Sequence, residues 1–132
     1  MAVDGRMLPH EWLLTPAGAY LKADAIDHHA DHFFPGPVAD IVWDLAGLAA
    51  EFGLPDATAS DIGSALGSAT GDPTLPARLP FHQAAYVAFR LGYATLAAAT
   101  LAGTADGARM GRLRRRYRRQ LERAVERLSA VL

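Results

Sequence analysis

Two helix-length segments fill most of the chain after residue 80, and this pattern constrains the fold more than any other feature. Residues 81–102 are apolar on nearly all sides, which predicts a helix that sits centrally in the molecule. Residues 108–131 carry apolar side chains at a regular spacing of three or four, which predicts a second, amphipathic helix. A chain of 132 residues can bury a core, so we expect a single domain over 1–132 that is mainly α.

The first half of the chain predicts a β-hairpin. Extended-looking runs at 11–15 and 19–26 flank the turn residues Pro16-Ala17-Gly18. The expected fold is therefore mainly helical with a small hairpin near the N-terminus.

Two shorter helices are expected between the hairpin and the long helical segments. Apolar residues from Val38 to Phe52 repeat at helical spacing, and Gly53 and Pro55 follow as stop signals. Residues 58–69 indicate a short helix. The prolines within 72–80 indicate a loop, because proline removes a backbone donor and disfavours helix in the residue before it.

The composition excludes several classes of protein. The chain has no cysteine, which excludes a disulfide scaffold and a Cys-type zinc site. Hydrophobic residues make up 51% and charged residues 20%, a balance that argues against disorder. The first residues contain no apolar stretch of a signal peptide, and the most apolar stretch, 84–103, is interrupted by Arg90. We therefore expect a soluble cytoplasmic protein with no membrane partner.

Charge is divided unevenly along the chain, although the net charge is only −1. Residues 1–72 hold 11 of the 14 acidic residues, whereas nine of the 13 basic residues lie between Arg109 and Arg127. Arginine binds phosphate through a bidentate fork, which makes nucleic acid a partner to consider. No aromatic side chain is interleaved on the basic face, so we favour a solvated helix face over a nucleic-acid surface. The two halves can also attract each other, and we expect Arg90 to pair with an aspartate of residues 38–52.

Acidic residues and histidines cluster after the expected hairpin. Carboxylates suit Mg²⁺ or Mn²⁺, whereas imidazoles suit Zn²⁺. The spacing matches no zinc motif, and a solvated polar turn has the same composition, so these interpretations stay open. The cluster consists of Asp24, Asp27, His28, His29, Asp31 and His32.

Two pairs of aspartates have the spacing of a known pattern. Asp24 and Asp27 are three residues apart. Thirteen residues further on, Asp40 and Asp44 are four residues apart, and Leu45-Ala46 follows. The arrangement resembles the C-terminal lobe of the aminoglycoside phosphotransferase and choline kinase group, a branch of the protein-kinase-like fold. In that group, a pattern like Ile-Asp-Trp-Gly-Asp-Ala-Gly precedes Gly-Asp-Pro-x-x-Asp-Leu-Ala.

The resemblance implies a role for each of these aspartates. Asp24 would match the ligand of the Mg²⁺ on the nucleotide phosphates, and Asp27 would lie beside it. Asp44 would match a buried helix aspartate that holds the catalytic loop through backbone N–H groups, and Asp40 would be a second structural aspartate. A buried carboxylate needs such charge-assisted hydrogen bonds to offset its lost hydration.

The catalytic loop of the family reads His-Gly-Asp-x-x-x-x-Asn before a strand, and residues 3–12 stand in its place. The resemblance makes Asp4 the residue that acts on the acceptor hydroxyl. Glu11 would take the place of the metal-binding asparagine, two residues further along than the pattern allows. No His-Gly precedes Asp4.

The N-terminal lobe of the family, with its Gly-rich loop and phosphate-binding lysine, has no counterpart in the sequence. Lys22, the one lysine, lies within the expected hairpin. The resemblance therefore implies a phosphotransferase-like lobe that is incomplete or inactive alone. It would use Mg²⁺ and ATP only when a partner chain supplies the N-terminal lobe.

Two other functions fit the same sequence. One is a non-catalytic helical module that binds a partner or forms a homo-oligomer. The other is a metal-binding protein that uses His28, His29 and His32.

Overall fold

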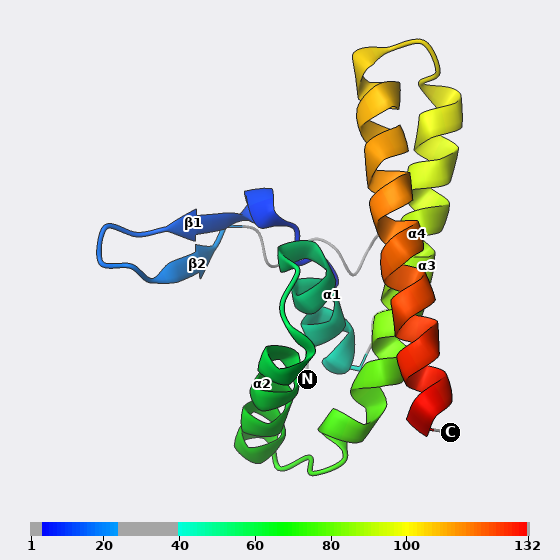
Figure 1. Ribbon diagram of the computed structural model, residues 1–132. Coiled ribbons are helices and arrows are strands. Elements are labelled where there is room, and N and C mark those ends of the chain that lie inside the picture. The colour runs from blue at the N-terminus through cyan, green and yellow to red at the C-terminus, as the bar shows by residue number, and fades with distance from the viewer. Residues whose placement is uncertain (1–3, 24–39, 132) are drawn as a thin grey trace. The chain divides into compact units, whose positions relative to one another are not determined.

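The computed structural model describes residues 4–23 and 40–131 (Figure 1). These residues are mainly helical, with a two-stranded antiparallel sheet near the N-terminus, as the sequence predicts. The elements are η1 (Pro9–Glu11), β1 (Trp12–Leu14), β2 (Tyr20–Lys22), α1 (Val42–Phe52), α2 (Asp56–Thr70), α3 (Leu75–Thr100) and α4 (Ala105–Val131).

The chain divides into two compact units, residues 1–79 and 80–132, which we describe separately. Two compact units can still fold as one domain, so the expected single domain over 1–132 stays a prediction. No helix among the described residues has both the length and the apolar character that a membrane crossing requires.

The hairpin forms where the sequence predicts it, with shorter strands. Leu13 lies opposite Leu21, and Leu14 lies opposite Tyr20. Gly18 has a φ of 81°, a conformation that glycine adopts without steric cost in the turn. All four paired side chains are more than half exposed, so both faces of the hairpin are apolar and open.

Helix α1 begins four residues later than the sequence suggests and ends where it predicts. The Asp40 carboxylate accepts a hydrogen bond from the Val42 backbone N–H at 3.1 Å and so satisfies a donor of the first turn. Gly53 follows the helix with a φ of 64°, the left-handed conformation of a helix C-cap. The helix contributes the main core of unit 1 through Val42, Leu45, Ala46 and Ala49.

The prediction of a loop over residues 72–80 is wrong from Leu75 onward, because α3 begins there. Pro76 lies in the first turn, where a backbone N–H has no helical partner to lose. Pro80 lies inside the helix. The end of α2 packs closely on the turn that precedes α3. A Cβ on Gly67 would lie only 2.6 Å from the Asp72 carbonyl oxygen.

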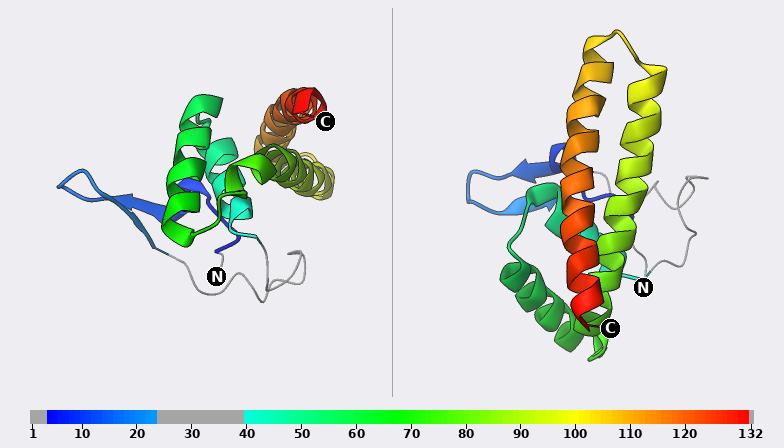
Figure 2. Two further views of the ribbon diagram at one scale, coloured as in Figure 1. Left: turned by 90° about the horizontal axis from the view of Figure 1, so that it is seen from below. Right: turned by 45° about the vertical axis from the view of Figure 1, so that its right-hand side comes forward.

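Unit 2 is an antiparallel pair of long helices, α3 and α4, which run side by side (Figures 1 and 2). Helix α4 begins at Ala105, three residues before the expected start. Thr104 explains the earlier start, because its hydroxyl accepts the Gly107 N–H at 3.0 Å as an N-cap.

The sequence predicts a centrally placed helix over residues 81–102, but several large apolar side chains of α3 are exposed. Its side chains Phe81, Tyr93 and Leu96 are 58%, 56% and 72% exposed. The helix packs mainly through Ala84, Tyr86, Val87 and Ala94, which are buried.

Arg90 bridges α3 and α4. Its Nε and Nη2 each donate a hydrogen bond to the hydroxyl of Tyr117, both at 3.3 Å. The guanidinium carbon also lies 5.5 Å from the centre of the Tyr117 ring, within the range of a cation–π contact. The phenol is therefore a polar partner of Arg90 within unit 2, and the expected pairing with an aspartate of residues 38–52 stays a prediction.

Candidate functional site

The candidate site lies where the segment before the hairpin meets α1. The Asp44 carboxylate accepts two backbone hydrogen bonds, from the N–H of Asp4 at 2.8 Å and from the N–H of Gly5 at 2.7 Å. The two donors use the two carboxylate oxygens separately. This is the kind of contact that the resemblance implies for Asp44, made to the loop in which it places Asp4.

The local sequence explains why the loop can approach α1. Gly5 is buried and has a φ of 82°, in the left-handed region that other residues rarely adopt. The indole N–H of Trp43 donates to the Gly5 carbonyl at 3.4 Å. Consecutive residues of α1, Trp43 and Asp44, therefore hold both polar groups of the Gly5 backbone.

Lys22 joins the two carboxylates that the resemblance assigns to catalysis and metal binding. Its Nζ lies 2.8 Å from Asp4 Oδ2 and 3.1 Å from Glu11 Oε2. All three side chains are close to nine-tenths buried. The hairpin produces this arrangement, because Trp12 pairs with Lys22 and thereby brings Glu11 beside it. We call Asp4, Glu11, Lys22 and Asp44 the Asp4 cluster.

Burial and hydrogen bonding act in opposite directions on the Asp4 cluster. Burial raises the pKa of Asp44 above its usual value, and the hydrogen bonds from Asp4 and Gly5 offset only part of this effect. Burial alone would lower the pKa of Lys22, but the hydrogen bonds to Asp4 and Glu11 outweigh it and raise that pKa. Lys22 is therefore held as an ammonium ion between two acidic side chains.

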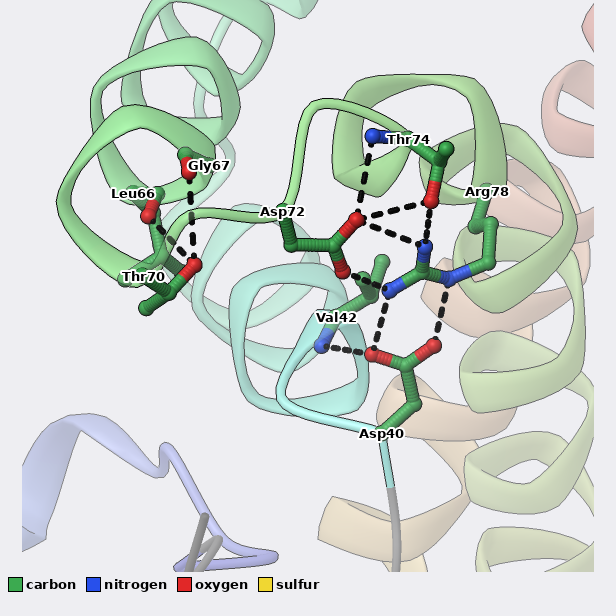
Figure 3. Close-up of polar contacts among 8 residues, drawn as sticks. All are labelled: Asp40, Val42, Leu66, Gly67, Thr70, Asp72, Thr74 and Arg78. Carbon is green, nitrogen blue, oxygen red and sulfur yellow. Dashed lines mark hydrogen bonds and ion pairs between the residues drawn. The ribbon is translucent and has the colours of Figure 1, made fainter.

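A second polar network connects the start of α1 with the start of α3 (Figure 3). Arg78 donates to Asp40 from Nε at 2.6 Å and from Nη2 at 3.1 Å, a bidentate contact. The same guanidinium contacts Asp72, with Nη2 2.8 Å from Oδ2. Thr74 completes the network, because its backbone N–H and its hydroxyl both donate to Asp72.

Hydrogen bonds favour the charged forms of Asp72 and Arg78. The Arg78 guanidinium and the Thr74 hydroxyl hold the pKa of Asp72 well below its usual range. The contacts to Asp40 and Asp72 raise the pKa of Arg78 above its usual value. The network has a structural role in unit 1: Asp40 binds the first turn of α1 and the first turns of α3 at the same time.

The metal ligands proposed from the sequence lie mostly outside the described residues. This is the case for Asp24, Asp27, His28, His29, Asp31 and His32. Glu11 is described, and Lys22 contacts its carboxylate. Within residues 4–23 and 40–131, no group of three or more acidic or histidine side chains is arranged to hold a metal ion. The described residues alone do not fit a Mg²⁺ site.

Two members of these networks were missed in the sequence. The sequence pattern gives Lys22 no role beyond its failure to match the phosphate-binding lysine of the family, and it gives Arg78 no role. The hairpin register contained a signal for Lys22, because pairing across the turn at 16–18 places residue 22 near residue 11. For Arg78 we find no comparable local signal.

We compared the chain with models of protein families, with curated proteins and with solved structures, and found no match in any of the three comparisons. The resemblance to the aminoglycoside phosphotransferase and choline kinase group therefore rests on the residue pattern itself.

Proposed function

We propose that the chain is a phosphotransferase-like C-terminal lobe that binds Mg²⁺-ATP weakly and needs a second lobe for catalysis. One observation carries the proposal: the Asp44 carboxylate holds the backbone of Asp4 and Gly5. A buried carboxylate that accepts two loop N–H groups fixes the position of the loop, and phosphoryl transfer depends on such positioning.

In this proposal Asp4 positions the acceptor hydroxyl. Lys22 contacts Asp4 Oδ2, so the hydroxyl would bind at Oδ1, which accepts a hydrogen bond from the Arg6 backbone N–H at 3.4 Å. Asp24 and Asp27 would hold Mg²⁺ with help from Glu11. The acceptor itself is a small molecule whose class the described side chains do not identify.

The hairpin supports the second part of the proposal, that another lobe is required. Leu13 and Leu21 form one exposed apolar pair, and Leu14 and Tyr20 form the next. Neighbouring residues of a strand point to opposite faces, so each face of the hairpin carries one of these pairs. A two-stranded ribbon with two open apolar faces gains stability when another element covers it.

Thermal unfolding with and without Mg²⁺-ATP tests the proposal. A ligand with a Kd of about 0.1 mM, added at about 5 mM, stabilises the folded state by about 2 kcal/mol. Asp24→Asn should abolish this stabilisation while leaving the unliganded melting temperature unchanged. Asp61→Asn, at an exposed position of α2, is the matched control and should retain it. No stabilisation of the wild-type protein, or equal stabilisation of the Asp24→Asn variant, contradicts the proposal.

The position of Lys22 favours a second candidate function, a non-catalytic binding module. An ammonium ion that contacts both Asp4 and Glu11 occupies the carboxylates that catalysis would use. Under this alternative, Mg²⁺-ATP leaves the melting temperature unchanged, and Leu13→Ser together with Leu21→Ser weakens binding of the partner without unfolding the protein.

A further inference from the structure

Helix α4 carries a row of arginines along one side. Its five members are separated alternately by three and four positions, which is the spacing of neighbours on one side of a helix. Four of them are exposed and the middle one is half-buried. The row rises about 21 Å along the helix, at about 1.5 Å per residue. We call this set the α4 arginine row: Arg109, Arg112, Arg116, Arg119 and Arg123.

The row has no acidic counterpart within unit 2. Residues 80–132 hold ten arginines against three acidic residues, a formal side-chain charge of +7, and no acidic residue lies between positions 107 and 121. Among the described residues of this unit, no acidic side chain forms an ion pair with Arg112, Arg115 or Arg119. Like charges three and four positions apart destabilise a helix, so the row favours an anion from outside the unit.

The length of the row indicates a polymeric anion. A single phosphate is bound by one or two guanidinium groups, since each of them can form a bidentate contact. A row of about 21 Å can contact several phosphates only when they are linked at regular intervals along a straight path. Double-stranded DNA provides this arrangement, because it carries one negative charge per about 1.7 Å of its axis.

The aromatic residues of α4 distinguish a duplex from a single strand. Proteins that bind single strands stack the bases on exposed aromatic rings, whereas the bases of a duplex are already stacked on one another. The one aromatic residue of α4, Tyr117, is 1% exposed. The absence of aromatic side chains from the basic face therefore argues against single strands and does not argue against a duplex.

The apolar side of α4 argues against a membrane surface. A basic amphipathic helix binds a membrane by burying its apolar side among the lipids. In α4 this side is already buried, because Tyr117 and Ala124 are each 1% exposed, and the Tyr117 hydroxyl accepts hydrogen bonds from Arg90 of α3. The arginines lie on the opposite, open side, and the major groove of DNA is wide enough to admit a helix, unlike that of duplex RNA.

We infer that the α4 arginine row binds the phosphate backbone of double-stranded DNA. Contacts to phosphates position a protein on the duplex and carry no sequence information, so the binding is independent of base sequence. The sequence alone favours a solvated helix face, and the continuous, unpaired arrangement of the arginines is what the structure adds. The inference does not depend on the proposed phosphotransferase function, since the row and the Asp4 cluster share no residue.

Fluorescence anisotropy of a labelled duplex of 20 base pairs, titrated with the full chain, tests the inference. Five phosphate contacts give a slope of about −4.5 for the logarithm of the association constant against the logarithm of salt concentration. The affinity should therefore fall about 500-fold between 50 mM and 200 mM salt. Arg112→Gln together with Arg119→Gln removes two contacts and should change the slope to about −2.7. Glutamine is a good helix former, so the helix should be retained.

A control variant separates the row from overall charge. Thr58→Glu together with Ser60→Glu, at exposed positions of α2, changes the net charge by the same amount and should keep the slope of the wild type. Arg112→Lys together with Arg119→Lys preserves the charge of the row and should also keep it. Circular dichroism should show the same helical content in all variants. If the glutamine variant lost its helix, Arg109→Gln together with Arg123→Gln would replace it.

Three results would overturn the inference. One is a failure of the full chain to bind the duplex at 50 mM salt and about 100 µM protein, as expected if the acidic residues of 1–72 cover the row. Another is an equal slope for a folded glutamine variant and the wild type. The third is tighter binding to a single strand of the same length, or to vesicles rich in phosphatidylserine, than to the duplex.

Discussion

The Asp44 side chain and the Gly5 backbone are joined by a hydrogen bond of 2.7 Å across 39 positions of the sequence. The same carboxylate holds the adjacent N–H of Asp4. A loop with little regular structure is thereby attached to a buried helix, and its conformation depends on one side chain of α1.

Asp44→Ala should lower the free energy of unfolding by about 2 kcal/mol, because the two N–H groups of the loop lose a charged acceptor. Urea unfolding followed by tryptophan fluorescence measures this change. Asp61→Ala, at an exposed position of α2, should alter the free energy by less than about 0.5 kcal/mol. Equal effects of the two substitutions would show that the loop does not depend on Asp44.

Asp44 should also give the protein a characteristic pH dependence. Its pKa in the folded state is raised, chiefly by burial, so the folded state binds a proton more tightly than the unfolded state does. The contribution of this group to stability is therefore greatest below its unfolded pKa of 3.8 and declines as pH rises through the folded pKa. Asp44→Asn should remove this decline from a series of urea titrations between about pH 3 and pH 7.

Lys22→Met should destabilise the protein by about 2 kcal/mol at neutral pH, because it removes the ammonium ion that contacts both Asp4 and Glu11. The raised pKa of Lys22 means that its contribution is complete below 10.5 and is lost as pH rises through the folded value. A pH-independent loss would indicate that packing of the lysine stem, not its charge, is what matters.

Much of the fold follows from local patterns in the sequence. The turn at Pro16-Ala17-Gly18 predicted the hairpin, and Gly53 predicted the end of α1. The start of α3 was missed because Pro76 and Pro80 were both interpreted as loop residues. Proline is compatible with the first turn of a helix, and the rest of a long helix can absorb one missing hydrogen bond further in.

The candidate site was less predictable than the fold. The resemblance placed Asp44 against the loop that contains Asp4, but the pairing of Lys22 with Asp4 and Glu11 depends on how the hairpin folds back on that loop. Arg78 meets Asp40 across 38 positions, and such a contact exists only once the first turn of α3 lies beside the start of α1. Long-range ion pairs follow from tertiary structure, so a single sequence gives no spacing rule for them.

Asp72→Asn should reduce the loss of folding stability that the protein shows as pH falls into the acid range. The hydrogen bonds from Arg78 and Thr74 lower the pKa of Asp72 in the folded state, so its contribution is present above its unfolded value of 3.8 and is lost as pH falls. The variant should therefore lose less stability than the wild type between about pH 4 and pH 2. Thermal unfolding across this range measures the difference. Parallel profiles for the two proteins would show that the Arg78–Asp72 contact is too exposed to stabilise the fold.

Tyr117→Phe tests how much of the α3–α4 pairing depends on a polar contact. The Tyr117 side chain is 1% exposed, and its hydroxyl accepts two hydrogen bonds from Arg90 at 3.3 Å. These bonds are long, so their removal should cost about 1 kcal/mol, less than well-formed hydrogen bonds to a charged group contribute. Phenylalanine keeps the buried ring and its cation–π contact with Arg90.

Tyr93→Phe is the control for this substitution. Its ring also lies near the Arg90 guanidinium, at 5.4 Å, but its side chain is 56% exposed. Loss of its hydroxyl should change the free energy of unfolding by less than about 0.5 kcal/mol. Tyr117→Ala should cost about 4 kcal/mol, because it leaves a cavity between the two helices. If Tyr117→Phe and Tyr93→Phe were equally mild, Arg90 would contribute to the pairing through its contact with the aromatic face of Tyr117 and not through the hydroxyl.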